Sequence, residues 1–182
     1  NEFSDKVAGV IIDEYKQFDF FQKESCIVLS QALYKDLSTQ ENSQGIITIC
    51  KYKHSKVENF KSDIILLDKI QDPGNLGTIV RIGDAVGIKD FILIKGTVDI
   101  YNEKVIRSTM GSIFSINFVY MDELEALKYL KERAYCIISS TLNENSINYT
   151  DMIVKEKNVL VFGNEGQGIS KIFQENSDQY IK

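Results

Sequence analysis

Two glycine-bearing segments carry the residues of this chain whose types and spacing could do chemistry. The first is QDPGNLGTIVRIGDAVG (71–87), in which Pro73 fixes its own backbone angle and two nearby glycines permit tight turns and close approach of a ligand. Asn75 is placed to cap the helix that follows, and Arg81 on that helix is free to face a cleft. A capped helix with a surface arginine is the alternative interpretation.

The second segment is VFGNEGQGIS (161–170), where three glycines follow an apolar strand and precede a helix start. Such a loop can place backbone N–H and C=O groups against a flat or anionic ligand. It is neither the G-x-G-x-x-G dinucleotide fingerprint nor a phosphate-binding P-loop. An adenosine-like ligand therefore stays open, and a glycine-rich turn without a ligand is the alternative.

Alternating strands and helices must position these two segments. Strands are predicted at 63–67, 90–95, 115–120, 134–139 and 158–163, and helices at 76–86, 102–110 and 122–132. This order predicts an α/β fold, a parallel sheet with helices on both faces. Ligands of such sheets bind beyond the carboxyl ends of the strands, so we expect the chemistry in the loops that follow them.

The predicted helix at 76–86 has an apolar face formed by Ile79, Ile82 and Val86, at three- and four-residue spacing. Arg81 points away from that face, toward the edge shared with its neighbours on the helix.

The residues before 63 form a second, smaller region. A strand at 24–30, a helix at 31–38 and a strand at 46–50 predict half of a small α/β unit. The apolar stretch Val7–Phe21 is predicted to be a helix. The polar stretch 51–62 reads as a linker.

This linker holds Lys51, Lys53 and Lys56, which could contact RNA phosphates or could be a solvated charged run. His54, the sole histidine, has no partners of ligand type at useful spacing and is a poor candidate for metal or acid–base chemistry.

The composition limits the class of protein. The 182 residues are 43% hydrophobic with a formal net charge of −5, which predicts a soluble globular chain whose nucleic-acid contacts would have to come from a local basic patch. No apolar run reaches membrane-spanning length and no signal peptide is evident. Cys26, Cys50 and Cys136 lack C-x-x-C spacing, so neither a disulfide framework nor a metal site is indicated, as expected of a cytoplasmic protein.

Three motifs together resemble a known family. NLGTIVR (75–81), IRSTMGSIFSI (106–116) and VFGNEGQGIS (161–170) are similar in order and strand context to the SpoU-type (TrmH-like) RNA ribose 2'-O-methyltransferases of the SPOUT superfamily. That family has Asn and Arg separated by five residues in its first motif and Gly-Asn/Pro-Glu-x-x-Gly in its second, and both match here. Residues 24–50 resemble the latter half of the small RNA-binding domain that precedes the catalytic domain in many members.

The resemblance implies S-adenosylmethionine as cofactor, a trefoil knot around it and a homodimer with sites near the subunit interface. It also implies a domain division: a partial RNA-binding domain at 1–52, a linker at 53–62 and a methyltransferase domain at 63–182. The family's third motif, which opens with Ile-Pro and contains Ser-Leu-Asn, is missing from the segment that ends in DQYIK. The chain as given is therefore expected to bind the cofactor poorly.

The resemblance also implies roles for individual residues. Arg81 would be the catalytic arginine, and because a guanidinium is a poor base we expect it to orient the ribose hydroxyl and adjacent phosphate. Asn75 would hold Arg81 and its loop in place, and Glu165 would hydrogen-bond within the loop. The implied cofactor-binding residues are Thr141, Leu142, Gly163, Asn164 and Gly168. The implied RNA-binding residues are Arg81 and Arg107, with Lys51, Lys53 and Lys56.

The expected activity is methylation of a ribose 2'-hydroxyl in ribosomal RNA. A tRNA ribose methyltransferase and a catalytically inactive RNA-binding assembly factor of the same fold are the alternatives. A nucleotide-binding oxidoreductase ranks last, because the dinucleotide fingerprint and its acidic partner are lacking.

Overall fold

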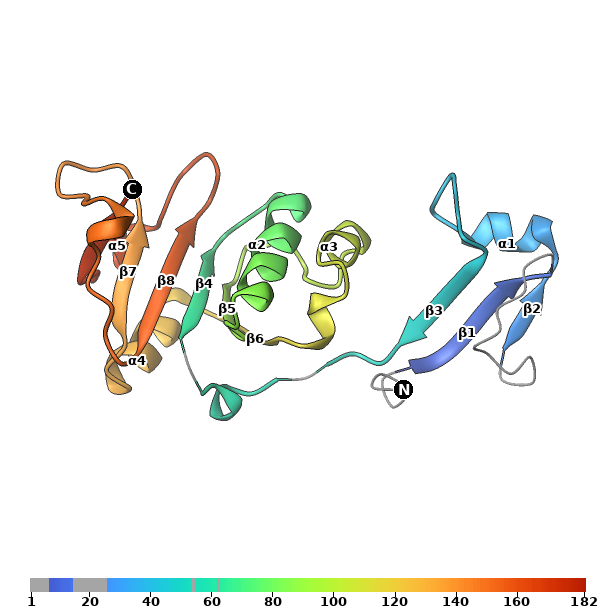
Figure 1. Ribbon diagram of the computed structural model, residues 1–182, viewed down its shortest axis with the longest axis horizontal. Coiled ribbons are helices and arrows are strands. Elements are labelled where there is room, and N and C mark those ends of the chain that lie inside the picture. Colours follow the sequence, from blue (N-terminus) through green and yellow to red (C-terminus); the bar gives the residue numbers. More distant parts are fainter. Residues whose placement is uncertain (1–6, 15–25, 54, 62) are drawn as a thin grey trace. The chain divides into compact units, whose positions relative to one another are not determined.

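A computed structural model describes residues 7–14, 26–53, 55–61 and 63–182 of the chain. The chain divides into two compact units, Asn1–Lys53 and His54–Lys182. Figure 1 labels helices α1–α5 and strands β1–β8 of the two units. His54 itself, and the part of the predicted first helix beyond residue 14, lie outside the described residues.

The first unit is a small sheet with one helix. The strand order is β2 (Ile27–Leu29), β1 (Val7–Asp13), β3 (Ile46–Cys50), with β1 parallel to β2 and antiparallel to β3. Helix α1 (Gln31–Leu37) contacts β1 and β2, and its amino end is capped by the Ser30 side chain. The predicted strand, helix and strand of this region are therefore confirmed.

The prediction of a helix from residue 7 is wrong, because Val7–Asp13 is the central strand of this small sheet. Four of its seven residues are branched at Cβ, which favours extended backbone. Val10 and Ile12, two positions apart on one face of the strand, are buried. The mixed polarity of the residues that follow hid this alternation.

The second unit is a six-stranded sheet with the order β6-β5-β4-β8-β7-β9, in which all neighbouring strands are parallel. The strands are β4 (Ile64–Asp68), β5 (Asp90–Ile94), β6 (Asn117–Met121), β7 (Cys136–Ser140), β8 (Asn158–Gly163) and β9 (Gln179–Ile181). The helices are α2 (Pro73–Ala85), α3 (Glu103–Ser108), α4 (Glu123–Glu132) and α5 (Lys171–Gln174), with 3-10 turns η3 (Val57–Asn59), η4 (Ser112–Phe114) and η5 (Tyr149–Asp151). The predicted parallel α/β sheet is confirmed, and β9 is an addition that the sequence did not reveal.

Helices cover both faces of this sheet because alternate residues of each central strand point to opposite sides. In β4, Ile64 and Leu66 pack in a cluster with residues of α4 and α5. Ile65 and Leu67 pack in a second cluster with residues of α2 and α3. Burial on both sides explains why these strands read as continuous apolar runs in the sequence.

Helix α2 begins earlier than predicted. Pro73 is its first residue, and Asp72, not Asn75, is the N-cap, accepting a hydrogen bond from the Asn75 backbone at 2.8 Å. Proline is favoured at this position because the first helical N–H has no partner within the helix. The Asn75 side chain is thereby left for contacts outside the helix.

The face of α2 that packs against the sheet also differs from the prediction. Leu76 and Val80 are fully buried, whereas Ile82 and Val86 are 55% and 68% exposed. Three- and four-residue spacing occurs on both faces of this helix, so the spacing alone could not distinguish the buried one.

A glycine brings α2 and α3 together, and Figure 1 shows the two helices as neighbours. A Cβ added to Gly77 would overlap that of Ser108 and lie 2.9 Å from the carbonyl oxygen of Val105. The close approach of the two helices therefore depends on the absence of a side chain at position 77. Among the described residues, no helix is long and apolar enough to cross a membrane.

Candidate active site

A pocket of about 290 Å³ lies beyond the carboxyl ends of the parallel strands. It is formed by the segments that follow β4 and β8, the first turns of α2 and the last residue of β7. Its lining residues are Ile70, Asn75, Thr78, Ile79, Ser140, Phe162, Gly163, Asn164, Glu165 and Gly168. Parallel α/β sheets bind ligands at this edge, and the two motifs found in the sequence meet here.

Asn75 and Glu165 join the two motifs. The Asn75 side-chain amide donates to a Glu165 carboxylate oxygen at 3.0 Å, and the Gln71 backbone N–H lies 3.5 Å from the other oxygen. Although partial burial alone would raise the pKa of Glu165, the hydrogen bonds from Asn75 and from the backbone lower it below its ordinary value. Glu165 is therefore held as a carboxylate that fastens the loop after β8 to the start of α2.

The glycine-rich loop is closed on itself. Backbone hydrogen bonds of 3.0 and 2.8 Å link Asn164 and Gly168 in both directions, and the Asn164 side-chain oxygen accepts from the N–H groups of Gly166 and Gln167, each at 2.9 Å. Any side chain on Gly163 would overlap the backbone of Gly168. Four amides of the loop, and the carbonyl oxygens of Asn164 and Gly168, are thus used inside it.

Asp68 is a polar residue of this edge that the sequence reasoning missed. It ends β4 opposite Gly163 of β8, is 1% exposed, and accepts a 2.6 Å hydrogen bond from the Ser170 backbone N–H. Its other oxygen and the Ser170 hydroxyl are buried without a partner among the described residues. Asp68 fixes the exit of the glycine-rich loop. Its position at the carboxyl end of a predicted strand was the signal that could have revealed it.

Arg81 is exposed and does not line the pocket. Successive residues of an α-helix are rotated by about 100° around its axis. This rotation places Arg81 between two faces of α2: the face of Gly77, which packs on α3, and the face of Thr78, which lines the pocket. Arg81 thus lies on α2 about one helical turn after the pocket residue Thr78.

The other predicted site residues are dispersed. Thr141 and Leu142 follow the pocket residue Ser140; Thr141 is half-buried, whereas Leu142 is 88% exposed, and neither lines the pocket. Arg107, on α3, is ion-paired with Glu103 one turn earlier. The three predicted RNA-binding lysines lie on the connection between the units: Lys51 and Lys56 are exposed and Lys53 is half-buried.

The pocket suits part of a nucleoside-like cofactor. Its volume lies near the lower limit of about 300 Å³ for ligand pockets, and apolar walls from Ile70, Ile79 and Phe162 face a few polar groups. An adenine amino group is a hydrogen-bond donor, which matches loop carbonyls better than loop amides. The residues present therefore fit such a group in chemistry and in size.

This fold and site define a parallel α/β protein with a nucleoside-sized pocket at the carboxyl edge of its sheet. The chain belongs to the SpoU rRNA Methylase family, whose sequence model matches residues 62–182.

Individual relatives agree with this assignment. The 23S rRNA (guanosine(2553)-2'-O)-methyltransferase RlmP of Bacillus subtilis is 33% identical over 159 residues, which are 84% of this chain and 61% of the relative. The chain thus spans less than two thirds of that relative's length.

Solved structures show the same fold. The SpoU methyltransferase AviRb from Streptomyces viridochromogenes, solved with AdoMet, superimposes with a TM-score of 0.83 at 20% identity, over 97% of this chain and 73% of AviRb. The TrmH/SpoU tRNA modifying enzyme of A. aeolicus has a TM-score of 0.59 at 28% identity, over 68% of this chain and 62% of that enzyme.

Proposed function

We propose that the protein transfers a methyl group from S-adenosylmethionine to a ribose 2'-hydroxyl of ribosomal RNA. The observation that carries this proposal is the meeting of Asn75 and Glu165 at a pocket lined by Gly163 and Gly168. The family assignment and the name of the B. subtilis relative support the reaction and the RNA class.

In the proposed reaction, a carbon–oxygen bond to the ribose forms as the carbon–sulfur bond of the cofactor breaks, and the hydroxyl proton is released. S-adenosylmethionine, when bound, supplies the electrophilic methyl group. The protein's contribution is alignment, since an in-line displacement needs the two reacting atoms held close together. The Arg81 guanidinium can hold a phosphate and the adjacent hydroxyl through several N–H donors at once.

Glu165 is better suited to holding the loop than to taking the proton. Its lowered pKa makes it a weaker base, and Asn75 occupies one of its oxygens. We therefore assign Asn75 and Glu165 to positioning and Arg81 to contact with the RNA. The proposed cofactor residues remain Thr141, Leu142, Gly163, Asn164 and Gly168.

The experiment compares wild type, Arg81→Ala and Lys128→Ala; Lys128 is an exposed cation on α4 that lines neither pocket. Labelled methyl transfer to ribosomal RNA and calorimetry with S-adenosylmethionine are measured for each. We expect Arg81→Ala to abolish transfer while cofactor affinity stays within about twofold, and Lys128→Ala to keep both. Substantial turnover by Arg81→Ala would contradict the proposal.

A tRNA ribose methyltransferase is the second candidate, favoured by the likeness to the A. aeolicus enzyme at 28% identity. Methyl transfer to separated ribosomal and transfer RNA, followed by mapping of the modified ribose, decides between them. Transfer to neither RNA, with RNA binding retained, would indicate an inactive assembly factor.

The same proposal includes a cytoplasmic homodimer with a trefoil knot around the cofactor, and an RNA-binding domain at 1–52 joined by a linker at 53–62. The division into two compact units after Lys53 supports the last point. Sedimentation of the purified protein tests the dimer. Neutralising Lys51, Lys53 and Lys56 tests their RNA contact through the salt dependence of binding.

A further inference from the structure

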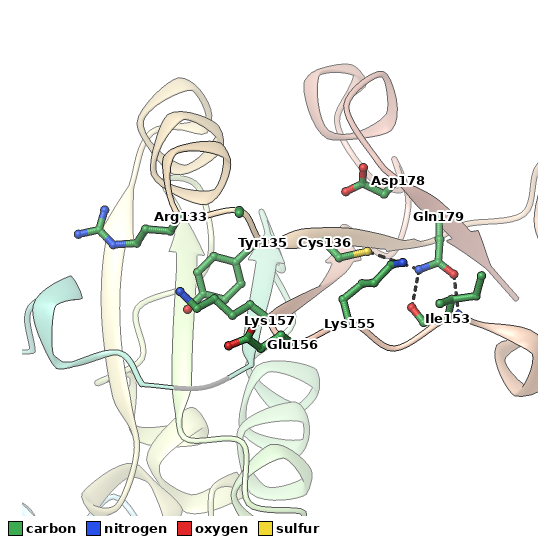
Figure 2. A pocket seen from close by; sticks show the side chains of 10 residues that line it. Arg133, Tyr135, Cys136, Ile153, Lys155, Glu156, Lys157, Asp178 and Gln179 are labelled. Carbon is green, nitrogen blue, oxygen red and sulfur yellow. Dashed lines mark hydrogen bonds between the residues drawn. The ribbon is translucent and has the colours of Figure 1, made fainter.

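A second pocket lies at the amino ends of β7, β8 and β9, opposite to the carboxyl ends where the candidate active site lies (Figure 2). Its volume is about 690 Å³. The lining residues are Arg133, Ala134, Tyr135, Cys136, Ile153, Lys155, Glu156, Lys157, Asp178 and Gln179. Because β8 has six residues and a strand rises about 3.3 Å per residue, roughly 17 Å of sheet separates this pocket from the candidate active site.

Two of the three cations of this pocket, Arg133 and Lys157, contact aromatic rings. The Arg133 guanidinium lies 4.4 Å from the centroid of the Tyr129 ring, and the Lys157 ammonium lies 5.9 Å from that of Tyr135. The two tyrosines stack with centroids 6.3 Å apart. Cation–π contact orients a cation while leaving its N–H donors available to an anion.

The loop that carries the two lysines is clamped in place. Lys155 donates its backbone N–H to the Asn158 side-chain oxygen at 2.8 Å, and the Asn158 amide returns a bond to the Lys155 carbonyl at 2.9 Å. Gln179 bonds both backbone groups of Ile153, at 2.7 and 2.8 Å, and its amide also lies 3.4 Å from the Cys136 sulfur. Figure 2 shows Lys155 extended along this wall.

None of the three cations is in an ion pair with another residue of the part that the structure describes. Two carboxylates, Glu156 and Asp178, share the pocket; Asp178 accepts a hydrogen bond from the Ile137 backbone N–H at 2.8 Å and keeps its charge. The three cations exceed the two carboxylates by one charge, which makes the pocket locally positive in a chain of net charge −5; Figure 2 shows Arg133 directed away from Lys155.

We infer that this pocket binds phosphate groups of an RNA backbone, as a second contact away from the methyl-transfer site. The inference rests on the proposed RNA substrate. RNA is favoured over an acidic peptide because phosphodiesters present a regular row of charges, and the lysine ammoniums act as point charges for phosphate. The overall acidity of the chain also requires local basic surfaces for any RNA contact.

The test measures the affinity of the protein for single-stranded oligouridylate across a range of salt concentrations. Each phosphate contact contributes about 0.7 to the slope of log affinity against log salt, so Lys155→Gln with Lys157→Gln should reduce the slope by about 1.4. The matched control is Lys128→Gln with Lys131→Gln, which removes the same charge from exposed α4 positions outside the pocket. Glu156→Gln should tighten binding, since it removes a negative charge from the rim.

Equal changes of slope in the two lysine pairs would overturn the inference, because net charge alone would then explain both. An unchanged slope in the pocket pair would overturn it as well. Calorimetry with S-adenosylmethionine should give wild-type affinity for every variant, since the cofactor edge is remote. If wild type transfers methyl groups to RNA while the pocket pair behaves like wild type in the salt titration, the proposed function stands and this inference fails. A wild type that binds no RNA overturns both.

Discussion

The Asn75 side-chain amide lies 3.0 Å from a carboxylate oxygen of Glu165, although 90 residues separate the two in the chain. This bond links the start of α2 to the glycine-rich loop after β8. With the Gln71 backbone N–H, which lies 3.5 Å from the other Glu165 oxygen, it connects the two motifs that define the candidate active site.

The coupling between these two residues can be measured. We expect Asn75→Ala and Glu165→Ala each to weaken binding of S-adenosylmethionine, and the double variant to be no worse than the poorer single one. A net hydrogen bond contributes about 1 kcal/mol, which corresponds to a coupling of about fivefold in affinity. Calorimetry on the four proteins measures it, with Gln167→Ala as a loop control. Additive losses would show that the two residues act independently.

The lowered pKa of Glu165 predicts that the glycine-rich loop is destabilised at acid pH. A carboxylate whose pKa is lower in the folded than in the unfolded protein stabilises the fold above the ordinary Glu value of about 4.3, and this contribution disappears as pH falls through the folded pKa. Cofactor affinity should therefore hold from pH 7 to about 5 and decline below about 4. Glu165→Gln should flatten this decline, and an identical acid profile for both proteins would contradict the assignment.

The raised pKa of Tyr135 predicts that the fold loses stability at alkaline pH. Burial, with smaller contributions from Tyr129 and nearby carboxylates, raises its pKa to about 12. The folded state then keeps the proton that the unfolded state releases near pH 10, so stability is complete below pH 10 and declines between about 10 and 12. In chemical unfolding across this range, Tyr135→Phe should lose less stability than wild type. Tyr149→Phe, at a 64% exposed position, should follow wild type.

The contact of Gly77 with α3 predicts that a larger residue at position 77 destabilises the fold. Gly77→Ala would force a methyl group against Ser108 and the Val105 carbonyl, at a cost of about 1–3 kcal/mol in unfolding free energy. Gly9→Ala, where the nearest atom is an Ile49 methyl at 3.9 Å, is the control and should cost less than 1 kcal/mol. Urea unfolding of both variants gives the comparison. If Gly77→Ala and Gly9→Ala had equal unfolding free energies, the close contact of α2 and α3 would not contribute to stability.

The buried hydrogen bond between Asp68 and the Ser170 backbone predicts that loss of the Asp68 carboxylate destabilises the fold. Asp68→Ala leaves the buried Ser170 N–H without its acceptor and should cost about 1–3 kcal/mol in unfolding free energy. Lys95→Ala removes an exposed ion pair with Asp122 and should cost no more than about 1 kcal/mol. Asp68→Asn keeps an acceptor oxygen and should recover part of the loss. An unchanged unfolding free energy in Asp68→Ala would refute the anchoring role.

Much of the second unit could be predicted from the sequence because its central strands are buried on both faces and read as unbroken apolar runs. The site motifs were equally visible, since Asn75 and Glu165 follow such strands. The start of α2 was misplaced because Asn75 and Asp72 are both good capping residues, and only Pro73 distinguishes them.

What could not be predicted depends on contacts between distant segments. Strand β9 has three residues and pairs with β7 only in the folded chain, so no local pattern marks it. The internal closure of the glycine-rich loop by the Asn164 side chain is likewise a matter of three-dimensional geometry. The exposed face of α2 was mistaken for the buried one because both carry apolar residues.

The placement of β8 beside β4 has a consequence for the order of folding. Strands β4, β5 and β6 are successive in the chain and pair with their sequence neighbours, whereas β8 must join β4 across about ninety intervening residues. Contacts of such long sequence separation form slowly, since the loop must close before any of them contributes. During synthesis, the half of the sheet that carries Arg81 can assemble first, and the pocket comes into existence only when residues 158–170 have left the ribosome.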